Sequence, residues 1–250
     1  MRTIPQIHGF ADDSITDRVA TCAVAVFDAE HVSDAEGVVA RHLSHLGLPK
    51  EARIHCWELF HGDARARTIW AGVGVAAIKA TLESICLDLK PLSYPPVVVI
   101  GDISALPSGW AGPDGKPWTL DAKGIATLAY HRAFGLIGHE HGPTNVRLWI
   151  DPDKTKIPWA DGRRQAQNTR RVHVEFRPGD EPYELVPDVT TGPKPRLIDI
   201  ADLYAYTAAR VKSSSGEQRD RWFEVLYRHI NPREIPGWSM PNTLDWQKGD

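Results

Sequence analysis

The chain has 250 residues, of which 42% are hydrophobic and 24% are charged, and its formal net charge is −3. These values are typical of a globular protein, and they exclude a uniformly basic nucleic-acid coat protein without excluding a local basic groove. The three cysteines form no CxxC pair, so neither a disulfide framework nor a thiolate zinc site is indicated. Because the sequence shows no signal-peptide pattern and no apolar run of membrane-spanning length, we expect a cytoplasmic protein that makes no contact with a membrane.

Strands and helices are predicted in turn along the chain. Two strands come first, at 4–10 and 19–28, and the second is rich in Val and Ala. The fully apolar run at 97–102 is typical of a central parallel strand covered on both faces. Further strands are predicted at 146–151 and 170–176. Apolar residues at helical spacing predict helices at 34–48, 68–89, 119–138, 195–211 and 219–230.

This order of elements predicts an α/β fold in which helices pack on a mixed sheet. No feature of the sequence forces a domain boundary, so residues 1–250 are predicted to form a single domain. Its core would span about residues 5–212, and a C-terminal helix and tail would follow at 216–250.

Acidic residues occur where three of the predicted strands end. Asp12 and Asp13 lie near the tip of the first strand, in a tight connection to the second. Asp102 and Asp151 end two later strands. In a parallel core these positions share the C-terminal edge of the sheet, where open α/β sheets place their sites. Converging carboxylates need a compensating cation, and Mg or Mn suits them because both ions prefer carboxylate and water oxygens. The alternative is that these aspartates only form turns, where Asp is common.

The predicted helix at 195–211 carries two aspartates, Asp199 and Asp202. They are three residues apart, so both can project from one face of the helix. Asp202 stands among apolar residues, and this unusual setting for a charge favours a functional role. The alternative is a solvent-facing carboxylate near the helix start, where the helix dipole favours Asp.

Four short blocks of the sequence, taken together and in chain order, carry more information than any one of them alone. They are "FADDS" at 10–14, "RIHCWELFHG" at 53–62, "VRLWIDPD" at 146–153 and "LIDIADLYAY" at 197–206. Together they resemble an uncharacterised family, domain of unknown function 3800, whose fold is RNase H-like. The blocks resemble its apolar-Asp-Glu-Ser opening, its block around a His, its strand ending in Asp and its apolar-Gln-apolar-Ala-Asp-apolar helix. The chain departs from this pattern at Asp13, where Glu is usual, Ile15, where Gly is usual, Arg53, where an acidic residue is expected, and Asp199, where Gln is usual.

The resemblance implies an RNase H-like mixed sheet with a carboxylate site at its C-terminal edge, and it implies a metal-dependent phosphodiester hydrolase, that is, a nuclease. In such a site, carboxylates hold two Mg or Mn ions about 4 Å apart, which activate a water and stabilise the leaving oxygen. Carried over block by block, the candidate metal ligands are Asp12, Asp13, Asp151 and Asp202. Asp12 would bridge the ions, with Asp151 and Asp202 beside them. Glu58 would complete the site and His55 would orient it or shuttle a proton, unless both have structural roles.

The stretch from Lys154 to Arg177 is basic and follows Asp151 directly. Its arginines include Arg163, Arg164, Arg170 and Arg171. We expect them to contact the phosphate backbone of a nucleic acid that enters the site. The alternative is a solvated loop without a partner.

Two other functions stay open. The segment "DPDKT" at 151–155 also resembles the first motif of haloacid-dehalogenase phosphatases, in which Asp151 would be the nucleophile and Asp153 the acid. The other alternative is a non-catalytic RNase H-like module that binds nucleic acid or protein. The sequence contains neither GxxxxGK[ST] nor GxGxxG, which argues against an ATP- or NAD-dependent mechanism.

Overall fold

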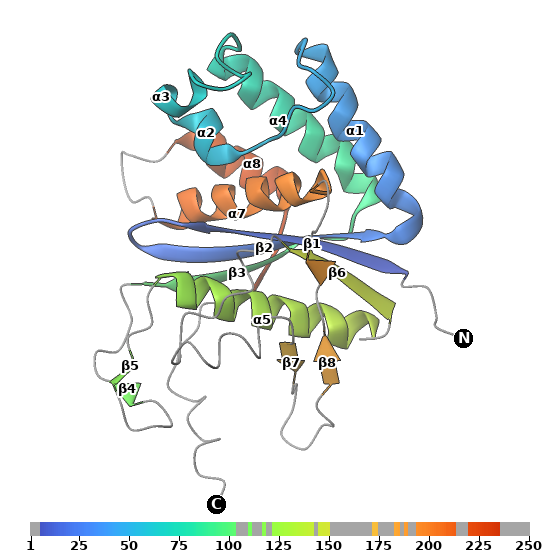
Figure 1. Ribbon diagram of the computed structural model, residues 1–250, viewed down its shortest axis with the longest axis vertical. Helices are drawn as coiled ribbons and strands as arrows, with labels where there is room; N and C mark the ends of the chain where they lie inside the picture. Colours follow the sequence, from blue (N-terminus) through green and yellow to red (C-terminus); the bar gives the residue numbers. More distant parts are fainter. Residues whose placement is uncertain are drawn as a thin grey trace, which may run out of the picture.

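The computed structural model describes residues 6–103, 110–111, 117–118, 122–142, 145–150, 172–174, 183–185, 188–189, 194–213 and 220–235. In this part of the chain, a mixed sheet lies between two unequal layers of helices (Figure 1). Helix α5 (Ala122–His141) covers one face of the sheet, and α7 (Leu197–Ser213) lies directly on the other. The further elements over α7 are α1 (Val32–His45), α2 (Cys56–Phe60), α3 (Gly62–Arg65), α4 (Val75–Leu89) and α8 (Arg221–Ile230), with short 3₁₀ turns η1 (Ala29–His31) and η2 (Lys90–Leu92).

The strands of the main sheet are β1 (Ile7–Ile15), β2 (Val19–Asp28), β3 (Val97–Asp102), β6 (Val146–Ile150), β9 (Asp188–Val189) and β10 (Arg233–Ile235). Their order across the sheet is β10-β3-β2-β1-β6-β9. Strands β1 and β3 are antiparallel to β2, whereas β6 runs parallel to β1 and β9 runs parallel to β6. Leaving aside the edge strand β10, this is the order 3-2-1-4-5 with an antiparallel second strand, which is the order of an RNase H-like sheet. The predicted fold class, an RNase H-like α/β fold with helices on a mixed sheet, is confirmed.

Two short pairs of strands form separate two-stranded sheets. They are β4 (Trp110–Ala111) with β5 (Pro117–Trp118), and β7 (Val172–Val174) with β8 (Tyr183–Leu185). Strand β7 falls within the strand predicted at 170–176, whereas the other three short strands were not predicted.

Alternation along β1 and β2 divides the core into two parts. Phe10 and Phe27 lie in the larger part, which α7 and its covering helices complete. Ala11 and Val24 lie in the smaller part, against α5. Since successive residues of a strand point to opposite faces, the position of a residue in β1 decides which layer of helices its side chain meets.

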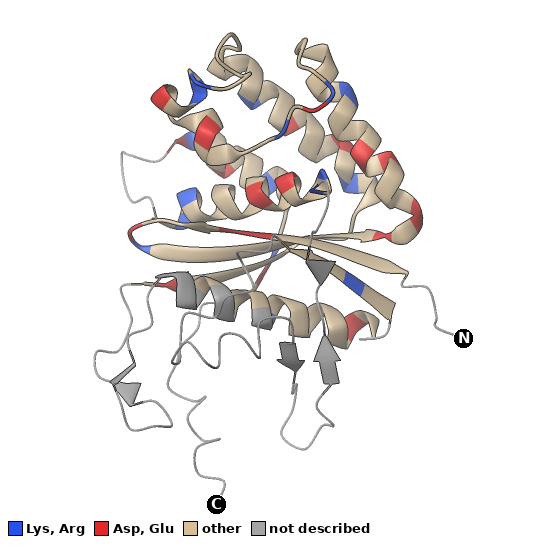
Figure 2. Cartoon of the chain, viewed as in Figure 1, with Lys and Arg blue, Asp and Glu red and all other residues tan. Residues whose placement is uncertain are grey.

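Helix α7 is buried along most of its length, because the sheet covers one side of it and other helices cover the opposite side (Figure 1). The buried residues run from Leu197 to Ala209 and include Asp199 and Asp202. The alternative of a solvent-facing Asp202 is therefore wrong. Figure 2 shows acidic positions toward the start of α7 and basic positions toward its end, an arrangement that the helix dipole favours.

Several predicted elements differ from those in the structure. The helix predicted at 68–89 begins only at Val75, because Gly74 has an extended conformation at its N-cap and glycine is a poor helix former. Asp12 and Asp13 lie inside β1, paired with residues of β2, and not in the connection between the strands. Strand β3 is covered on both faces as expected, and it pairs parallel with β10 on one side but antiparallel with β2 on the other.

The C-terminal addition predicted at 216–250 contains helix α8 and the short edge strand β10, of which the sequence predicted only the helix. Phe223, Leu226 and Ile230 form the buried face of α8. The side chain of Asp220 caps its start by accepting a hydrogen bond from the Trp222 amide at 3.0 Å. Over the described ranges, no helix is long and hydrophobic enough to span a membrane.

Candidate functional site

Asp12 and Asp202 lie close together where α7 crosses β1. Asp12 follows Phe10 by two residues in β1, so its side chain points to the same face, toward α7. Asp202 comes from the first half of α7, and the two residues are only 6% and 7% exposed. Burial and then the charge of Asp12 raise the pKa of Asp202 to about 7. The structure thus brings together two of the predicted carboxylates from segments that are far apart in the sequence.

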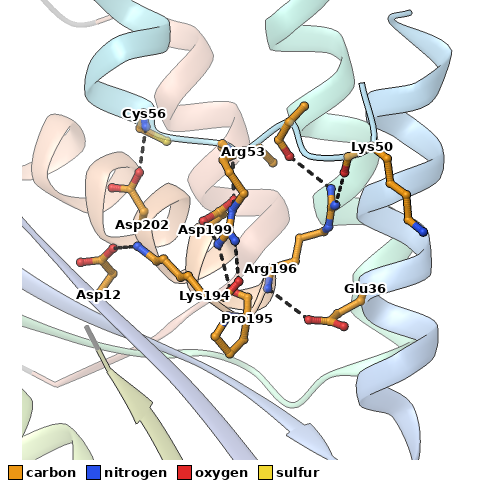
Figure 3. A network of polar contacts seen from close by, with 12 residues as sticks. Asp12, Glu36, Lys50, Arg53, Cys56, Lys194, Pro195, Arg196, Asp199 and Asp202 are labelled. Carbon is orange, nitrogen blue, oxygen red and sulfur yellow. Dashed lines mark hydrogen bonds and ion pairs between the residues drawn. The ribbon is translucent and has the colours of Figure 1, made fainter. Parts of the chain in front are cut away.

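The strap, residues 50–56, is irregular up to His55 and ends at the first residue of α2, and it crosses the first half of α7. The Ile54 amide donates a hydrogen bond of 3.0 Å to Oδ2 of Asp199, and the Cys56 amide donates one of 2.8 Å to Oδ2 of Asp202 (Figure 3). Amides two residues apart in an extended chain point in the same direction, and side chains three residues apart on a helix share a face. The amides of Ile54 and Cys56 can therefore reach Asp199 and Asp202 at the same time. The strap therefore fixes the orientation of both carboxylates.

Arg53 in the strap neutralises Asp199. Its Nε donates to Oδ2 at 2.7 Å, and its Nη2 donates to Oδ1 at 2.7 Å. The same guanidinium donates to the carbonyl oxygens of Lys194 and Pro195, just before α7. Asp199 therefore attaches the strap to the helix, and its two oxygens are taken up by donors of the chain itself. Arg53 and Asp199, two positions at which the chain departs from the pattern that its four sequence blocks resemble, thus bind each other.

Lys194 is a residue of the site that the sequence analysis did not single out. Its Nζ lies 3.7 Å from Oδ2 of Asp12, and its side chain is 33% exposed (Figure 3). The other carboxylate oxygen of Asp12 accepts a hydrogen bond of 2.8 Å from the Asp13 amide. The sequence shows only that Lys194 is a cationic residue shortly before the helix that carries Asp202. It does not show that this lysine contacts Asp12 in β1.

The side chain of Asp13 lies on the other face of β1, toward α5. Its Oδ1 accepts a hydrogen bond of 2.9 Å from the hydroxyl of Tyr130. Burial, and next the charge of Asp13, raise the pKa of Tyr130, so this hydroxyl is a neutral donor. Because neighbouring strand residues point to opposite faces, the structure does not bring the Asp13 side chain into the pair formed by Asp12 and Asp202.

His55 and Glu58 lie at the rim of the site. Nδ1 of His55 is 3.3 Å from Oε1 of Glu58, and the two side chains are 56% and 40% exposed. A charge on His55 lowers the pKa of Asp202, which shows that the imidazole is near the carboxylate pair. Cys56 beside it is fully buried, and burial followed by the charges of Asp202 and Asp199 raises the pKa of its thiol. This thiol is therefore neutral and offers no thiolate ligand.

The remaining predicted residues lie away from this pair or outside the described residues. Asp102 is exposed at the end of β3, level with Val19 and not with Asp12, so it does not join the site. Within the described ranges, no group of three or more His, Cys, Asp or Glu side chains could hold a metal ion. The predicted residues outside the described ranges are Asp151, Arg163, Arg164, Arg170 and Arg171.

Comparison with known proteins adds little to this geometry. No family model matches the sequence, and no curated protein resembles it significantly. Among solved structures, the chain is similar to the ribonuclease H2 from Pyrococcus horikoshii OT3, with 13% sequence identity and a TM-score of 0.40. The alignment covers 98% of this chain and 89% of that chain. Values this low assign neither a family nor an activity.

Proposed function

We propose that this protein is a divalent-metal-dependent phosphodiester hydrolase, a nuclease, and that Asp12 and Asp202 bind its metal. The observation that carries the proposal is the meeting of these two carboxylates below the surface. Two carboxylates held together away from water are unfavourable as a pair of anions unless one of them holds a proton or a cation accompanies them. A divalent ion that prefers oxygen ligands, Mg or Mn, supplies this charge.

The donors at the site fit such an ion. Asp12 and Asp202 offer carboxylate oxygens, and the Cys56 amide orients the second of these carboxylates, as hydrogen bonds commonly do for metal-binding carboxylates. We propose Asp151 as a further ligand from the sequence. It follows Trp149 by two residues, just as Asp12 follows Phe10, and Trp149 pairs with Phe10 in the sheet. When bound, a pair of these ions supplies an activated water and a stabilised leaving oxygen.

The side chains of the chain itself have distinct roles in this proposal. The strap holds the Asp202 carboxylate in place through the Cys56 amide. His55 is exposed at the rim, where its imidazole can exchange a proton with solvent, and its contact with Glu58 orients the ring. The burial of Asp12 and Asp202 lowers the local dielectric and strengthens every charge interaction in the site.

We propose nucleic acid as the substrate, because it is the common phosphodiester polymer and because a basic stretch follows Asp151 in the sequence. Its arginines would contact phosphates as the chain enters the site. This part of the proposal rests on the sequence, as does membership of the domain of unknown function 3800 family. The positions concerned are Arg163, Arg164, Arg170 and Arg171.

Cleavage of a labelled oligonucleotide tests the proposal. The wild-type protein should cut it in the presence of Mg or Mn, and EDTA should stop the reaction. Asp12→Asn and Asp202→Asn each remove one charge and keep the side-chain shape. Each should slow cleavage by more than about a hundredfold, since even the partners of metal ligands commonly contribute ten- to a hundredfold. Asp102→Asn is the matched control, because Asp102 is exposed and away from the pair, and it should cleave at the wild-type rate.

This assay, a trapping experiment for a covalent phosphate and a metal-binding measurement together separate the alternatives. Cleavage that survives in Asp202→Asn or in EDTA contradicts the proposal. A phosphate trapped covalently on Asp151 would favour the phosphatase. Metal binding without cleavage of any oligonucleotide would favour the non-catalytic module.

A further inference from the structure

The contact between Lys194 and Asp12 places a cation of the chain itself beside the carboxylate pair. We propose that Lys194 is an internal counter-ion of the site. Its ammonium group neutralises Asp12 while no metal is bound, and a divalent ion displaces it. Lys194 is thus a positioning residue that sets the metal affinity. The inference rests on the proposed function, because it takes Asp12 as a metal ligand.

The geometry of the contact allows the ammonium group to leave. The 3.7 Å between Nζ of Lys194 and Oδ2 of Asp12 is longer than a hydrogen bond, so the contact is an ion pair without a fixed direction. One third of the lysine side chain is exposed. A lysine head group sits on a flexible four-carbon stem, so it can turn toward solvent without leaving a cavity in the core.

The backbone that carries Lys194 is held firmly, in contrast to its side chain. The carbonyl oxygens of Lys194 and Pro195 both accept hydrogen bonds from Arg53 (Figure 3). The next residue, Arg196, completes the anchoring through contacts with Glu36, Lys50 and Ala52. The ammonium group can therefore move between Asp12 and solvent while the start of α7 stays in place.

A divalent ion and the ammonium group compete for Asp12. Oδ1 of Asp12 already accepts the Asp13 amide, and Oδ2 is the oxygen near Lys194. Two cations within a few ångströms repel each other strongly in a site that is shielded from water. Lys194 therefore stabilises the metal-free site and weakens metal binding.

Calorimetric titration with MnCl₂ measures the competition directly. Lys194→Met keeps the length of the side chain and removes its charge, whereas Lys194→Arg keeps the charge. Lys194→Met should bind Mn²⁺ about tenfold more tightly than the wild type, a usual factor for coupling between two ligands. Lys194→Arg should stay near the wild-type affinity. Lys90→Met is the control, because it removes an exposed lysine of η2, outside the strap, and it should leave the dissociation constant unchanged.

Thermal unfolding in EDTA provides a readout without metal. Lys194→Met should lower the melting temperature in the wild-type background but not in Asp12→Asn, where the partner charge is gone. An equal decrease in both backgrounds overturns the inference. Equal binding of Mn²⁺ by the wild type and Lys194→Met overturns it as well, while the metal site stands. If neither protein binds Mn²⁺, the proposed function fails, and the inference fails with it.

Discussion

Asp199 and Asp202 lie on the same buried helix and both accept a hydrogen bond from the strap, yet their surroundings differ. Asp199 receives two more hydrogen bonds from Arg53, so its charge is neutralised in place. Asp202 faces a second carboxylate, Asp12, and burial and this neighbour raise its pKa to about 7. The contrast between Asp199 and Asp202 shows two different roles that a buried carboxylate can have. A buried charge with a compensating partner holds the structure together, whereas a buried charge that faces a like charge is a candidate for a functional site.

The largest expected effect tests the structural half of this comparison. Arg53→Met should lower the free energy of unfolding by about 4 kcal/mol, because it leaves the charge of Asp199 buried without its partner. Urea denaturation at neutral pH measures the loss. The double variant Arg53→Met/Asp199→Asn removes both charges and should recover part of it. A single variant as stable as the wild type would show that Arg53 does not compensate Asp199.

The second prediction concerns the pH dependence of stability in EDTA. The folded protein holds a proton on Asp202 with a pKa of about 7, against an ordinary value of 3.8, so the folded state binds this proton more tightly than the unfolded state. The resulting stability is present at low pH and is lost as the pH rises toward and through 7. Between pH 5 and pH 8, the wild type should lose about 3 kcal/mol more of its unfolding free energy than Asp202→Asn.

Urea denaturation of both proteins at the two pH values measures this difference. Asp102→Asn serves as the control, since Asp102 is exposed, and it should follow the wild type at both values. If Asp202→Asn shows the same pH dependence as the wild type, Asp202 is not held against Asp12, and the contrast with Asp199 disappears.

The fold was accessible from the sequence where local patterns determine it. The apolar run of β2 and the apolar periodicity of α7 and α8 are local properties, and the order of such elements predicts the α/β class. The strap has no periodicity, so no pattern revealed that it crosses α7. Strand β10 has three residues and pairs with β3, which is far away in the sequence. Such elements exist because of their tertiary partners.

The site was accessible in part for the same reason. Asp12 and Asp202 could be singled out because a charge among apolar residues is conspicuous, and the structure places them together. The ion pair of Arg53 with Asp199 joins positions separated by 146 residues, and the approach of Lys194 to Asp12 depends equally on the tertiary fold. That these residues bind metal stays a prediction.

The smallest expected effect concerns Asp13, which the sequence groups with Asp12 and the strand separates from it. Tyr130→Phe removes one hydrogen bond to Asp13 on the α5 face and should lower the free energy of unfolding by about 1 kcal/mol. It should leave the rise in melting temperature caused by MnCl₂ unchanged, because that response depends on the opposite face of β1. Asp12→Asn, measured beside it, should lose most of the response. A loss of the response in Tyr130→Phe would mean that Asp13 takes part in the metal site, and that the alternation of β1 does not divide a structural aspartate from a functional one.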